Sequence, residues 1–439
     1  MSRRPSIPLD TLVEIDGLDQ DGAGLAAVGA RRLRVFGALP GERSTVRVMR
    51  RRQGRLETVA ETVAQSHVDR VSPPCPYAGR CSGCALQHLA PSAQRRFKRE
   101  RLAGLLLDAG VPAPERWLAD VHGPELGYRR KARLGARLVP GKGGVLLGYR
   151  ERGSGRIADL DACRTLAPEI GERLIALRAL IGSLTVAAAV PQIEIAVGDD
   201  ATAIIVRHLE PLGDADRARL EEGGRALSLH VYLQPAGPDS VHRIWPLEGA
   251  EVLHYRLAAF DLDFRFHPLE FVQVNPFVNA AMVAQAVDLL APSKNERVLD
   301  LFCGLGNFTL PLATRSGKVV GMEGSQALVT RAQENAVANG LDNVRFEATD
   351  LYGSACTPAR LPAADAVLLD PPRSGAEILC RDMGALGPRR VLYVSCNPET
   401  LARDARLLHD GGFRLEAAGI LDMFPHTTHV ESMALFRAV

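Results

Sequence analysis

The sequence contains no long apolar run, no recognisable secretory signal and almost no net charge. None of its apolar runs reaches the roughly 18 residues that a membrane-spanning helix needs. The first ten residues, MSRRPSIPLD, contain basic side chains but no apolar core behind them, so they do not resemble a signal peptide. We therefore expect a cytoplasmic protein that has no membrane partner.

No internal repeat or low-complexity segment stands out in the sequence either. A hydrophobic fraction of 46% and a charged fraction of 24% are typical of a globular protein. At 439 residues the chain is too long for one ordinary hydrophobic core. The composition and length together predict two or three domains.

The net charge of +2 hides an uneven distribution along the chain. Residues 1–70 carry 12 basic and 9 acidic side chains, and residues 71–165 carry 17 basic and 8 acidic ones, so the remainder is acidic overall. A basic first third can simply be a solvated surface, but clustered Lys and Arg side chains are also what contacts phosphates. We expect a polyanion, and nucleic acid in particular, to bind the N-terminal part.

The first two thirds of the chain have the alternating pattern of β-strands. Residues 9–64 contain short alternating runs separated by DG, GAG and LPGE turns, which predicts a small β-barrel similar to the TRAM domain of RNA-modifying enzymes. Residues 92–109 predict a helix with Leu102, Leu105 and Leu106 on one face and basic residues on the other. Residues 124–265 return to strands and predict a mostly antiparallel middle domain. The basic edge of the barrel comprises Arg47, Arg50, Arg51, Arg52 and Arg55.

Helical and strand patterns alternate after about residue 268, as in RVLDLFCG, SQALVTRAQENAVANG and AVLLDPPR. Such alternation predicts an α/β fold built on a doubly wound parallel sheet. In such a sheet, ligands bind at the carboxyl ends of the strands. The run Val391–Val394 predicts a buried strand, and Pro398 prevents it from continuing, so Cys396 is expected at a strand end.

Four cysteines in the first half of the chain have the pattern of metal ligands. Cys75, Cys81 and Cys84 form C-x5-C-x2-C, and Cys163 is a fourth candidate. Closely spaced thiols in a cytoplasmic protein are more often metal ligands than disulfide partners. Zinc and an iron–sulfur cluster both remain possible, but zinc pairs favour shorter spacings, so we favour a [4Fe-4S] cluster. The isolated cysteines Cys303, Cys356 and Cys380 are predicted to pack in the interior or lie on the surface.

Acidic residues at successive predicted strand ends suggest a crevice for an adenosine-containing ligand. A strand ending at Leu301 is followed by a Gly304-x-Gly306 turn, which lets the backbone approach such a ligand closely. Glu323 lies about twenty residues further on, where an acid can bind ribose hydroxyls. Asp350 and Asp370 end the next two predicted strands. NAD remains an alternative, although Thr309 replaces the third glycine of its usual motif.

The C-terminal half resembles the class I S-adenosylmethionine methyltransferases, and among them the RNA uracil-C5 methyltransferases. The motifs that carry this resemblance are FVQVNP, DLFCGLGNFTL, LLDPPRSGA, YVSCNPETLARD and DMFPHTTHVESMALF. With the barrel and the four cysteines, the resemblance covers nearly the whole chain and is nearest to the 23S ribosomal RNA branch. It implies S-adenosylmethionine and a [4Fe-4S] cluster as cofactors, and 23S rRNA as the partner of a monomeric enzyme. The implied domains are a TRAM-like barrel (1–68), a cluster-bearing middle domain (69–265) and a methyltransferase domain (266–439).

The resemblance also implies roles for individual residues. Cys396 would be the nucleophile that adds to carbon-6 of uracil, because carbon-5 alone is too poor a nucleophile. Glu431 would be the base that removes the carbon-5 proton. The other implied sets are cofactor contacts (Gln273, Phe302, Asn307, Glu323, Asp350 and Asp370), substrate contacts (Phe271, Gln273 and Asp370), cluster ligands (Cys75, Cys81, Cys84 and Cys163) and an RNA-facing surface beside the cluster (Arg80, Arg95, Arg96 and Lys98).

Several alternatives remain at this stage. The same chemistry could act on another 23S rRNA uridine or on tRNA. A DNA or protein amino-methyltransferase would share the glycine turn, but Arg373 and Cys396 argue against it. A non-catalytic RNA-binding protein would explain the barrel, the cluster and the charge, but not Cys396 together with Glu431. His426 and His429 could be acids or bases, although a hydrogen-bonded structural role is the more common one for such residues.

Overall fold

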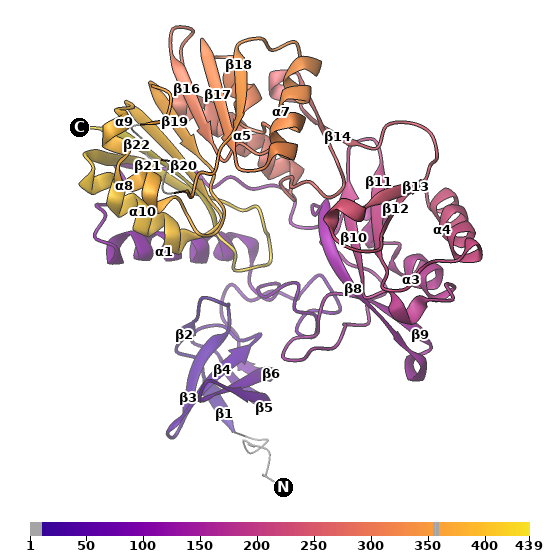
Figure 1. Ribbon diagram of the computed structural model, residues 1–439. Helices are drawn as coiled ribbons and strands as arrows, with labels where there is room; N and C mark the ends of the chain where they lie inside the picture. Colours follow the sequence, from indigo (N-terminus) through magenta and orange to yellow (C-terminus); the bar gives the residue numbers. More distant parts are fainter. Residues whose placement is uncertain (1–10, 354–355, 357–359) are drawn as a thin grey trace.

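The computed structural model describes residues 11–353, 356 and 360–439, and these residues form four sheets (Figure 1). The segment MSRRPSIPLD, which bears on the expected absence of a secretory signal, lies outside the described residues. Among the helices that the structure describes, none has the length and hydropathy needed to cross a membrane.

The N-terminal strands form one six-stranded sheet in the order β1-β5-β6-β4-β3-β2. Its side chains alternate, so that Val13, Leu33, Val35 and Val46 face a small core of their own. This sheet occupies the segment for which short strands were predicted. Its strands are β1 (Leu12–Glu14), β2 (Gly17–Leu18), β3 (Gly24–Val28), β4 (Arg31–Phe36), β5 (Arg43–Arg52) and β6 (Arg55–Gln65).

The helix predicted for residues 92–109 is present as α1 (Pro91–Asp108), which comes after the N-terminal sheet in the chain. The environment predicted for one of its basic residues, however, differs from the one observed. Leu102 and Leu106 are buried, and the helix packs against α10 (Pro398–Asp410) and β21 (Phe413–Leu421) of the C-terminal half, beneath which it lies in Figure 1. Lys98, predicted to face RNA, is 0% exposed, because its ammonium group pairs with the buried carboxylate of Asp422. The prediction for Lys98 was therefore wrong.

A second six-stranded sheet forms the middle of the chain, in the order β13-β12-β11-β10-β8-β9. All neighbouring pairs are antiparallel except β11 and β12, which agrees with the mostly antiparallel prediction. The strands are β8 (Lys131–Val139), β9 (Gly144–Gly148), β10 (Gln192–Val197), β11 (Thr202–Arg207), β12 (Leu229–Gln234) and β13 (His242–Trp245). The helices here are η1 (Pro140–Lys142), α2 (Pro168–Gly171), α3 (Leu174–Gly182), η2 (Ala187–Ala189), α4 (Asp214–Ala226) and η3 (Pro238–Ser240).

A two-stranded hairpin connects this sheet to the C-terminal half. Its strands β14 (Leu253–Leu257) and β15 (Leu262–Phe266) flank the short helix η4 (Ala258–Phe260). Tyr255 stacks on Phe264 with ring centroids 4.8 Å apart, and both belong to a core shared with helix α5 (Pro276–Leu290). The hairpin therefore packs on the C-terminal half, although it precedes the predicted division at residues 265 and 266. That division remains a prediction.

The C-terminal half is an eight-stranded sheet in the order β18-β17-β16-β19-β20-β22-β21-β7. The first five of these strands are parallel, which confirms the predicted α/β class. The strands not yet located are β7 (Arg116–Trp117), β16 (Arg297–Leu301), β17 (Lys318–Glu323), β18 (Val344–Ala348), β19 (Ala366–Leu369), β20 (Arg390–Ser395) and β22 (Glu431–Ala438). Its further helices are α6 (Thr309–Ala313), α7 (Gln326–Ala338), α8 (Glu377–Arg381) and α9 (Met383–Leu386).

The alternating pattern had predicted a parallel sheet, but the sheet is not parallel throughout. Strand β22 runs antiparallel to both β20 and β21. A parallel connection needs a crossover of a dozen or more residues, usually a helix, and only nine residues separate β21 from β22. This antiparallel insertion brings the start of β22 beside the end of β20.

Candidate active site

The carboxyl ends of four neighbouring parallel strands bring the predicted site residues into one row. Glu323 is the last residue of β17, Phe302 follows β16, Asp370 follows β19 and Cys396 follows β20. Because β17, β16, β19 and β20 are adjacent in that order, these residues line one edge of the sheet. Asp350, two residues beyond β18, is exposed at the end of this row.

Cys396 lies in a tight turn between β20 and α10. The hydroxyl group of Ser395 accepts a hydrogen bond from the Asn397 amide N–H at 3.1 Å and donates to the Asn397 carbonyl at 3.0 Å, so the turn closes around the cysteine. The Asn397 side chain accepts from the Glu399 N–H and donates to the Arg373 carbonyl at 2.9 Å. Asn397 therefore caps α10 and also fixes the loop after β19. Pro398, as the first helical residue, has no N–H that would need a partner.

The surroundings of Cys396 disfavour its thiolate in the free protein. The pKa of its thiol is raised to about 11, mainly by burial and also by the nearby carboxyl groups of Glu431 and Asp370, whereas the Arg373 guanidinium opposes this rise. The thiol, the two carboxyl groups and the guanidinium thus form one electrostatic cluster at the strand ends.

Burial also raises the pKa values of the two carboxyl groups in this cluster. The pKa of Asp370 rises to about 7. That of Glu431, which is 3% exposed, lies well above its usual range because of burial and the proximity of Asp370, while Arg373 opposes this effect. Carboxyl groups with raised pKa values are stronger bases than ordinary ones and can accept protons near neutral pH. Strongly perturbed groups in a cleft are typical of functional sites.

The segment after β16 has the left-handed backbone that a close ligand approach requires. Phe302, Gly304 and Gly306 have φ angles of +67°, +56° and +95°. A Cβ atom on Gly306 would lie 2.5 Å from Leu310 Cδ1, whereas one on Gly304 would meet no atom within 4 Å. The Gly304 N–H donates to the Glu323 carboxylate at 3.2 Å, which ties this turn to the end of β17.

Asn307 is held by an amide pair and is not free to turn. It exchanges two hydrogen bonds of 2.9 and 3.0 Å with the side chain of Asn279 on α5, and its Oδ1 also accepts from the Tyr255 hydroxyl at 2.9 Å. Among the described residues, the second amide hydrogen of Asn307 has no hydrogen-bond partner, so it can bind only one ligand acceptor.

The loop before α5 carries the predicted Phe271 and Gln273. Phe271 is 68% exposed and Gln273 is half-buried. Lys131 donates to the Glu270 carbonyl at 3.0 Å, and the Arg130 N–H donates to the Val274 carbonyl at 2.9 Å. The middle sheet therefore fixes both ends of this loop, and Phe271 projects from it as an exposed aromatic side chain.

Two residues beside the glycine turn after β16 were not predicted from the sequence. Tyr352 packs against Phe302 with ring centroids 5.5 Å apart, and its hydroxyl donates to the Gly375 carbonyl at 3.0 Å. Asp300 is completely buried below the turn, accepts from the Thr309 hydroxyl at 2.5 Å, and its Oδ1 has no partner. Burial raises its pKa to about 8. An aromatic residue two positions after Asp350 was the available signal for Tyr352.

The two histidines before β22 lie in different environments. His426 is 3% exposed, its backbone N–H donates to Gln94 at 2.8 Å, and its Nδ1 lies 3.2 Å from the Gln94 amide nitrogen. His429 Nδ1 lies 3.4 Å from the Arg373 guanidinium. His426 therefore has a structural environment, whereas His429 contacts a member of the charged cluster.

The four predicted ligand cysteines line one small cavity, although Cys163 is far from the others in sequence. All four are free thiols and are only partly buried. Burial, together with the proximity of the other thiols, raises the pKa of Cys81 to about 11 and that of Cys84 to about 12. In the described part of the chain, no group of three or more His, Cys, Asp or Glu side chains has the geometry of a site for a single metal ion.

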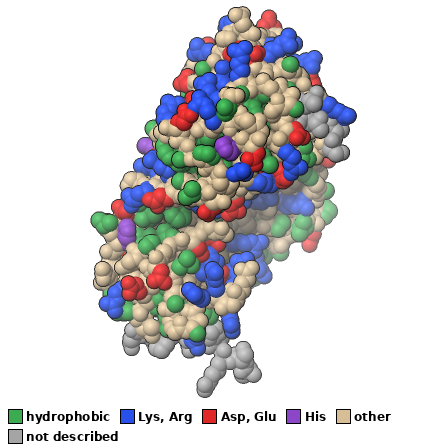
Figure 2. All heavy atoms as spheres, turned by 90° about the vertical axis from the view of Figure 1, so that its left-hand side faces the viewer, with side chains coloured by type: hydrophobic (Ala, Val, Ile, Leu, Met, Phe, Trp, Pro, Cys, Tyr) green, Lys and Arg blue, Asp and Glu red, His purple; other side chains and the backbone are tan. Residues whose placement is uncertain are grey.

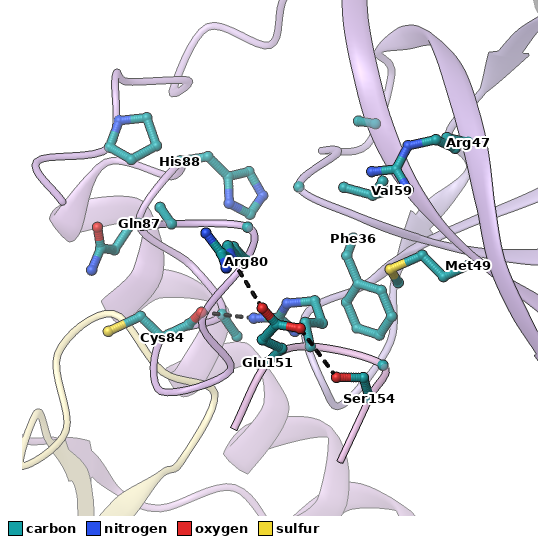
Figure 3. Close-up of a pocket in the computed structure, with 18 of the residues that line it drawn as sticks. Phe36, Arg47, Met49, Val59, Arg80, Cys84, Gln87, His88, Glu151 and Ser154 are labelled. Atoms are coloured by element: carbon teal, nitrogen blue, oxygen red, sulfur yellow. Dashed lines mark hydrogen bonds and ion pairs between the residues drawn. The ribbon is translucent and has the colours of Figure 1, made fainter. Parts of the chain in front are cut away.

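A larger cavity of about 830 Å³ separates the N-terminal sheet from the cysteine loop (Figure 3). The Arg152 guanidinium lies 4.7 Å from the centroid of the Phe36 ring and donates to the Cys84 carbonyl at 2.7 Å, so it links the two walls. Glu151 pairs with Arg80 at 3.0 Å. The charged side chains of the lining are Arg47, Arg70, Arg80, Arg152, Arg156 and Glu151, so the cavity is predominantly basic.

The face shown in Figure 2 carries many Lys and Arg side chains beside the hollow between its upper and lower parts. Arg80 and Arg96, two of the residues predicted to face RNA, are exposed, and Arg96 pairs with Asp69. Exposed basic side chains near a hollow are suited to contact a phosphate backbone.

Comparison with known proteins identifies relatives along the whole chain. Residues 250–439 match the family model described as tRNA (Uracil-5-)-methyltransferase. A curated 23S rRNA (uracil(1939)-C(5))-methyltransferase RlmD from Alkalilimnicola ehrlichii is 48% identical over 438 residues, which cover 99% of this chain and 98% of the relative. The enzyme of the same name from Hahella chejuensis is 44% identical over 99% of both chains.

One solved structure also covers nearly the whole chain. The crystal structure of Pyrococcus abyssi tRNA (uracil-54, C5)-methyltransferase in complex with S-adenosyl-L-homocysteine superposes with a TM-score of 0.74. It is 25% identical to this chain and covers 97% of it and 100% of the archaeal chain. With full-length relatives of 44–48% identity, the chain belongs to the RlmD family of 23S rRNA (uracil-C5)-methyltransferases.

Proposed function

We propose that the protein transfers the methyl group of S-adenosylmethionine to carbon-5 of a uridine in 23S rRNA, the one that corresponds to position 1939. The observation that carries this proposal is the cluster of Cys396, Glu431, Asp370 and Arg373 at the strand ends. The named activity of full-length relatives supports the choice of RNA, and the archaeal structure with S-adenosyl-L-homocysteine supports the choice of cofactor.

The proposed chemistry uses Cys396 as the nucleophile and Glu431 as the base. The thiol gives its proton to solvent, and its sulfur adds to carbon-6 of uracil, which moves the electrons of the carbon-5 to carbon-6 double bond to carbon-5. Carbon-5 then takes the methyl group that S-adenosylmethionine would supply, which would leave S-adenosylhomocysteine. Glu431 removes the carbon-5 proton, the carbon-5 to carbon-6 double bond re-forms, and the carbon–sulfur bond breaks to release Cys396. Asp370 faces the uracil, so that its side chain is a second carboxyl group close to the reacting atoms.

The cofactor would occupy the crevice above β16, β17 and β18. The open space at Gly304 and the left-handed turn on either side of it support this assignment. We assign adenosine and ribose contacts to Phe302, Glu323 and Asp350, and contacts shared by cofactor and uracil to Gln273 and Asp370. Asn307 contributes through its remaining amide hydrogen, and Phe271 provides an aromatic surface for the RNA base.

A [4Fe-4S] cluster is proposed for the small cavity lined by the four cysteines. Three observations support it: Cys75, Cys81, Cys84 and Cys163 line the same cavity, none is in a disulfide, and a cluster needs four thiolates further apart than a single ion does. The thiol pKa values are raised mainly by burial and further by the neighbouring sulfurs, and a bound metal deprotonates its thiols outright. Methyl transfer has no redox step, so the proposed role of the cluster is to hold the RNA-binding loop.

RNA would contact the TRAM-like barrel, residues 1–68, and the cluster-bearing middle domain, residues 69–265. The basic cavity of Figure 3 supports this assignment, because Phe36 and the Arg152 guanidinium offer flat surfaces on which an unstacked base can lie. Residues 266–439 would provide the methyltransferase domain. The target uridine must leave the RNA stack to reach Cys396. The enzyme is proposed to act as a cytoplasmic monomer.

The test is to mix the purified protein with S-adenosylmethionine and a 23S rRNA fragment that contains 5-fluorouridine at the target position. Fluorine replaces the proton that Glu431 must remove, so the methylated adduct cannot be released. A denaturation-resistant protein–RNA complex would support the proposal, and its absence would contradict it. A tRNA substrate with the same substitution serves as the competitor. Trapping of the tRNA alone would favour the tRNA alternative, and RNA binding without any trapping would indicate a non-catalytic protein.

A further inference from the structure

Helix α1 carries a row of polar side chains that serves the segment immediately before the proposed base. Gln94, Lys98 and Arg101 are spaced i, i+4 and i+7, so they lie on one face of the helix. All three contact residues 422–428, which belong to the loop between β21 and β22. That loop ends at Val430, and Glu431 is the first residue of β22.

Lys98 holds the beginning of this loop through two of its three donors. Its ammonium group donates to Asp422 Oδ1 at 2.6 Å and to the Phe424 carbonyl at 3.0 Å. Lys98 and Asp422 are 0% and 2% exposed. A buried ion pair of this kind adds little net stability but is costly to break, so it fixes one arrangement of the backbone.

Gln94 holds the middle of the same loop, at the residue with the strained backbone. His426 has a φ of +65°, which is unfavourable for a residue with a Cβ atom. Gln94 Oε1 accepts from the His426 N–H at 2.8 Å, while Gln94 Nε2 donates to the Leu89 carbonyl at 2.8 Å. The His426 carbonyl accepts from the N–H groups of Ala85 and Leu86, both at 2.9 Å. These bonds stabilise a conformation that His426 would not adopt alone.

The end of the loop reaches the charged cluster. Arg101 donates to the Thr428 carbonyl at 3.4 Å, and His429 contacts Arg373 at 3.4 Å. Arg373 in turn lowers the pKa values of Cys396 and Glu431. A displacement of the loop would therefore move Glu431 and also disturb Arg373, a cation that acts on both Cys396 and Glu431.

We propose that Gln94 and Lys98 are positioning residues for the proton-removal step, because they hold the 422–430 loop that places Glu431 against carbon-5 of the uracil. This inference rests on the proposed function. The polar face of α1 would thus serve the second half of the reaction, in which the carbon-5 proton is removed and the product is released. Formation of the adduct depends on Cys396 at the end of β20. In the described residues neither Gln94 nor Lys98 hydrogen-bonds to the turn around Cys396, and the contact of Arg101 with Glu399 at 3.3 Å, which ties α1 to the first turn of α10, is left in place by both variants tested below.

The experiment compares two variants with the wild-type enzyme. Gln94→Leu removes the hold on His426, and the double variant Lys98→Met with Asp422→Leu replaces the ion pair by apolar groups without leaving a lone buried charge. Glu100→Gln, on the exposed face of α1, is the matched control. Each protein is assayed for trapping by 5-fluorouridine RNA, which needs no base, and for release of methylated product from ordinary uridine RNA.

We expect both variants to trap 5-fluorouridine RNA at the wild-type rate. Release from ordinary RNA should be at least tenfold slower, with covalent complex accumulating during turnover and KM unchanged. A parallel loss of trapping and release would overturn the proposal, because it would mean general damage to the site. Normal release in both variants would overturn it as well. If the wild-type enzyme itself fails to trap the fluorinated RNA, the proposed function fails and not the positioning role alone.

Discussion

Cys396 and Glu431 lie beside each other because β20 and β22 pair antiparallel in a fixed register. Ser395, which precedes the cysteine, pairs with Ser432, which follows the glutamate. The proposed nucleophile therefore leaves one strand at the point where the proposed base enters the next. This pairing explains why the Glu431 carboxyl group raises the pKa of the Cys396 thiol, and it places the proposed nucleophile and the proposed base on the same edge of the sheet.

Replacement of Cys396 by alanine should lower the rate of methylation by several orders of magnitude, because no other group at the strand ends can form the carbon-6 adduct. Binding of S-adenosylmethionine should remain nearly intact, since the glycine turn after β16 does not depend on this thiol. The measurements are methyl transfer from labelled cofactor and calorimetric titration of the cofactor. Substantial turnover in Cys396→Ala would exclude the covalent mechanism.

Replacement of Glu431 by glutamine should separate the two halves of the reaction. The amide keeps the shape of the side chain but cannot accept the carbon-5 proton, so methylation should proceed and release should fail. A covalent protein–RNA species should then accumulate on denaturing gels with ordinary uridine RNA. The double variant with Cys396→Ala is the control and should form no such species. Free methylated RNA at the wild-type rate would show that Glu431 is not the base.

Replacement of any one of the four proposed iron–sulfur ligands, for example Cys84→Ala, should lower the iron content of the protein. It should also weaken RNA binding more than it weakens binding of S-adenosylmethionine. The physical reason is that the ligands join residues 75–84 to residue 163, and Arg152 holds the Cys84 carbonyl beside the basic cavity. Iron and sulfide analysis of anaerobically purified protein, with RNA and cofactor titrations, measures this. Cys380→Ala is the matched control, because Cys380 is completely buried away from the cavity. Stoichiometric zinc without iron would reject the cluster, and a fully active protein without either metal would reject a positioning role.

The strand ends could be predicted from the sequence because their signals are local. An apolar run followed by Asn-Pro or by a glycine turn marks a strand end by itself, and this is how Cys396 and Gly304 were located correctly. The position of Glu323 at the end of β17 followed from the same pattern. The antiparallel course of β22 was not predicted, because helix and strand alternation says nothing about the direction of the last strand.

Lys98 shows why other features could not be predicted. In an amphipathic pattern a lysine beside arginines indicates a solvated face, but its partner Asp422 lies 324 residues away and is brought close only by tertiary packing. Tyr352 was missed for a related reason, since its contacts with Phe302 and Gly375 join residues that are distant in the chain. A local signal thus located Cys396 at its strand end and the family resemblance supplied Glu431, while the residues that hold both of them required the structure.

The rate at which an alkylating reagent modifies Cys396 should respond in opposite directions to the removal of its negative neighbour Glu431 and of its positive neighbour Arg373. Only the thiolate reacts, and the pKa of this thiol is raised to about 11, so iodoacetamide should modify it slowly at neutral pH and faster as the pH rises. Glu431→Gln removes a negative neighbour, which stabilises the thiolate and should shift the rate profile to lower pH. Arg373→Gln removes a positive neighbour and should shift it to higher pH.

The rates would be measured by mass spectrometry of the Cys396 peptide between about pH 7 and 11, a range that brackets the ordinary thiol pKa. Cys396→Ala corrects for modification of the other seven cysteines in the chain. Because the two substitutions change the charge next to the thiol in opposite directions, a general loosening of the fold cannot reproduce both shifts. Shifts in the same direction, or no shift in either variant, would mean that the charges of Glu431 and Arg373 do not control the pKa of the Cys396 thiol.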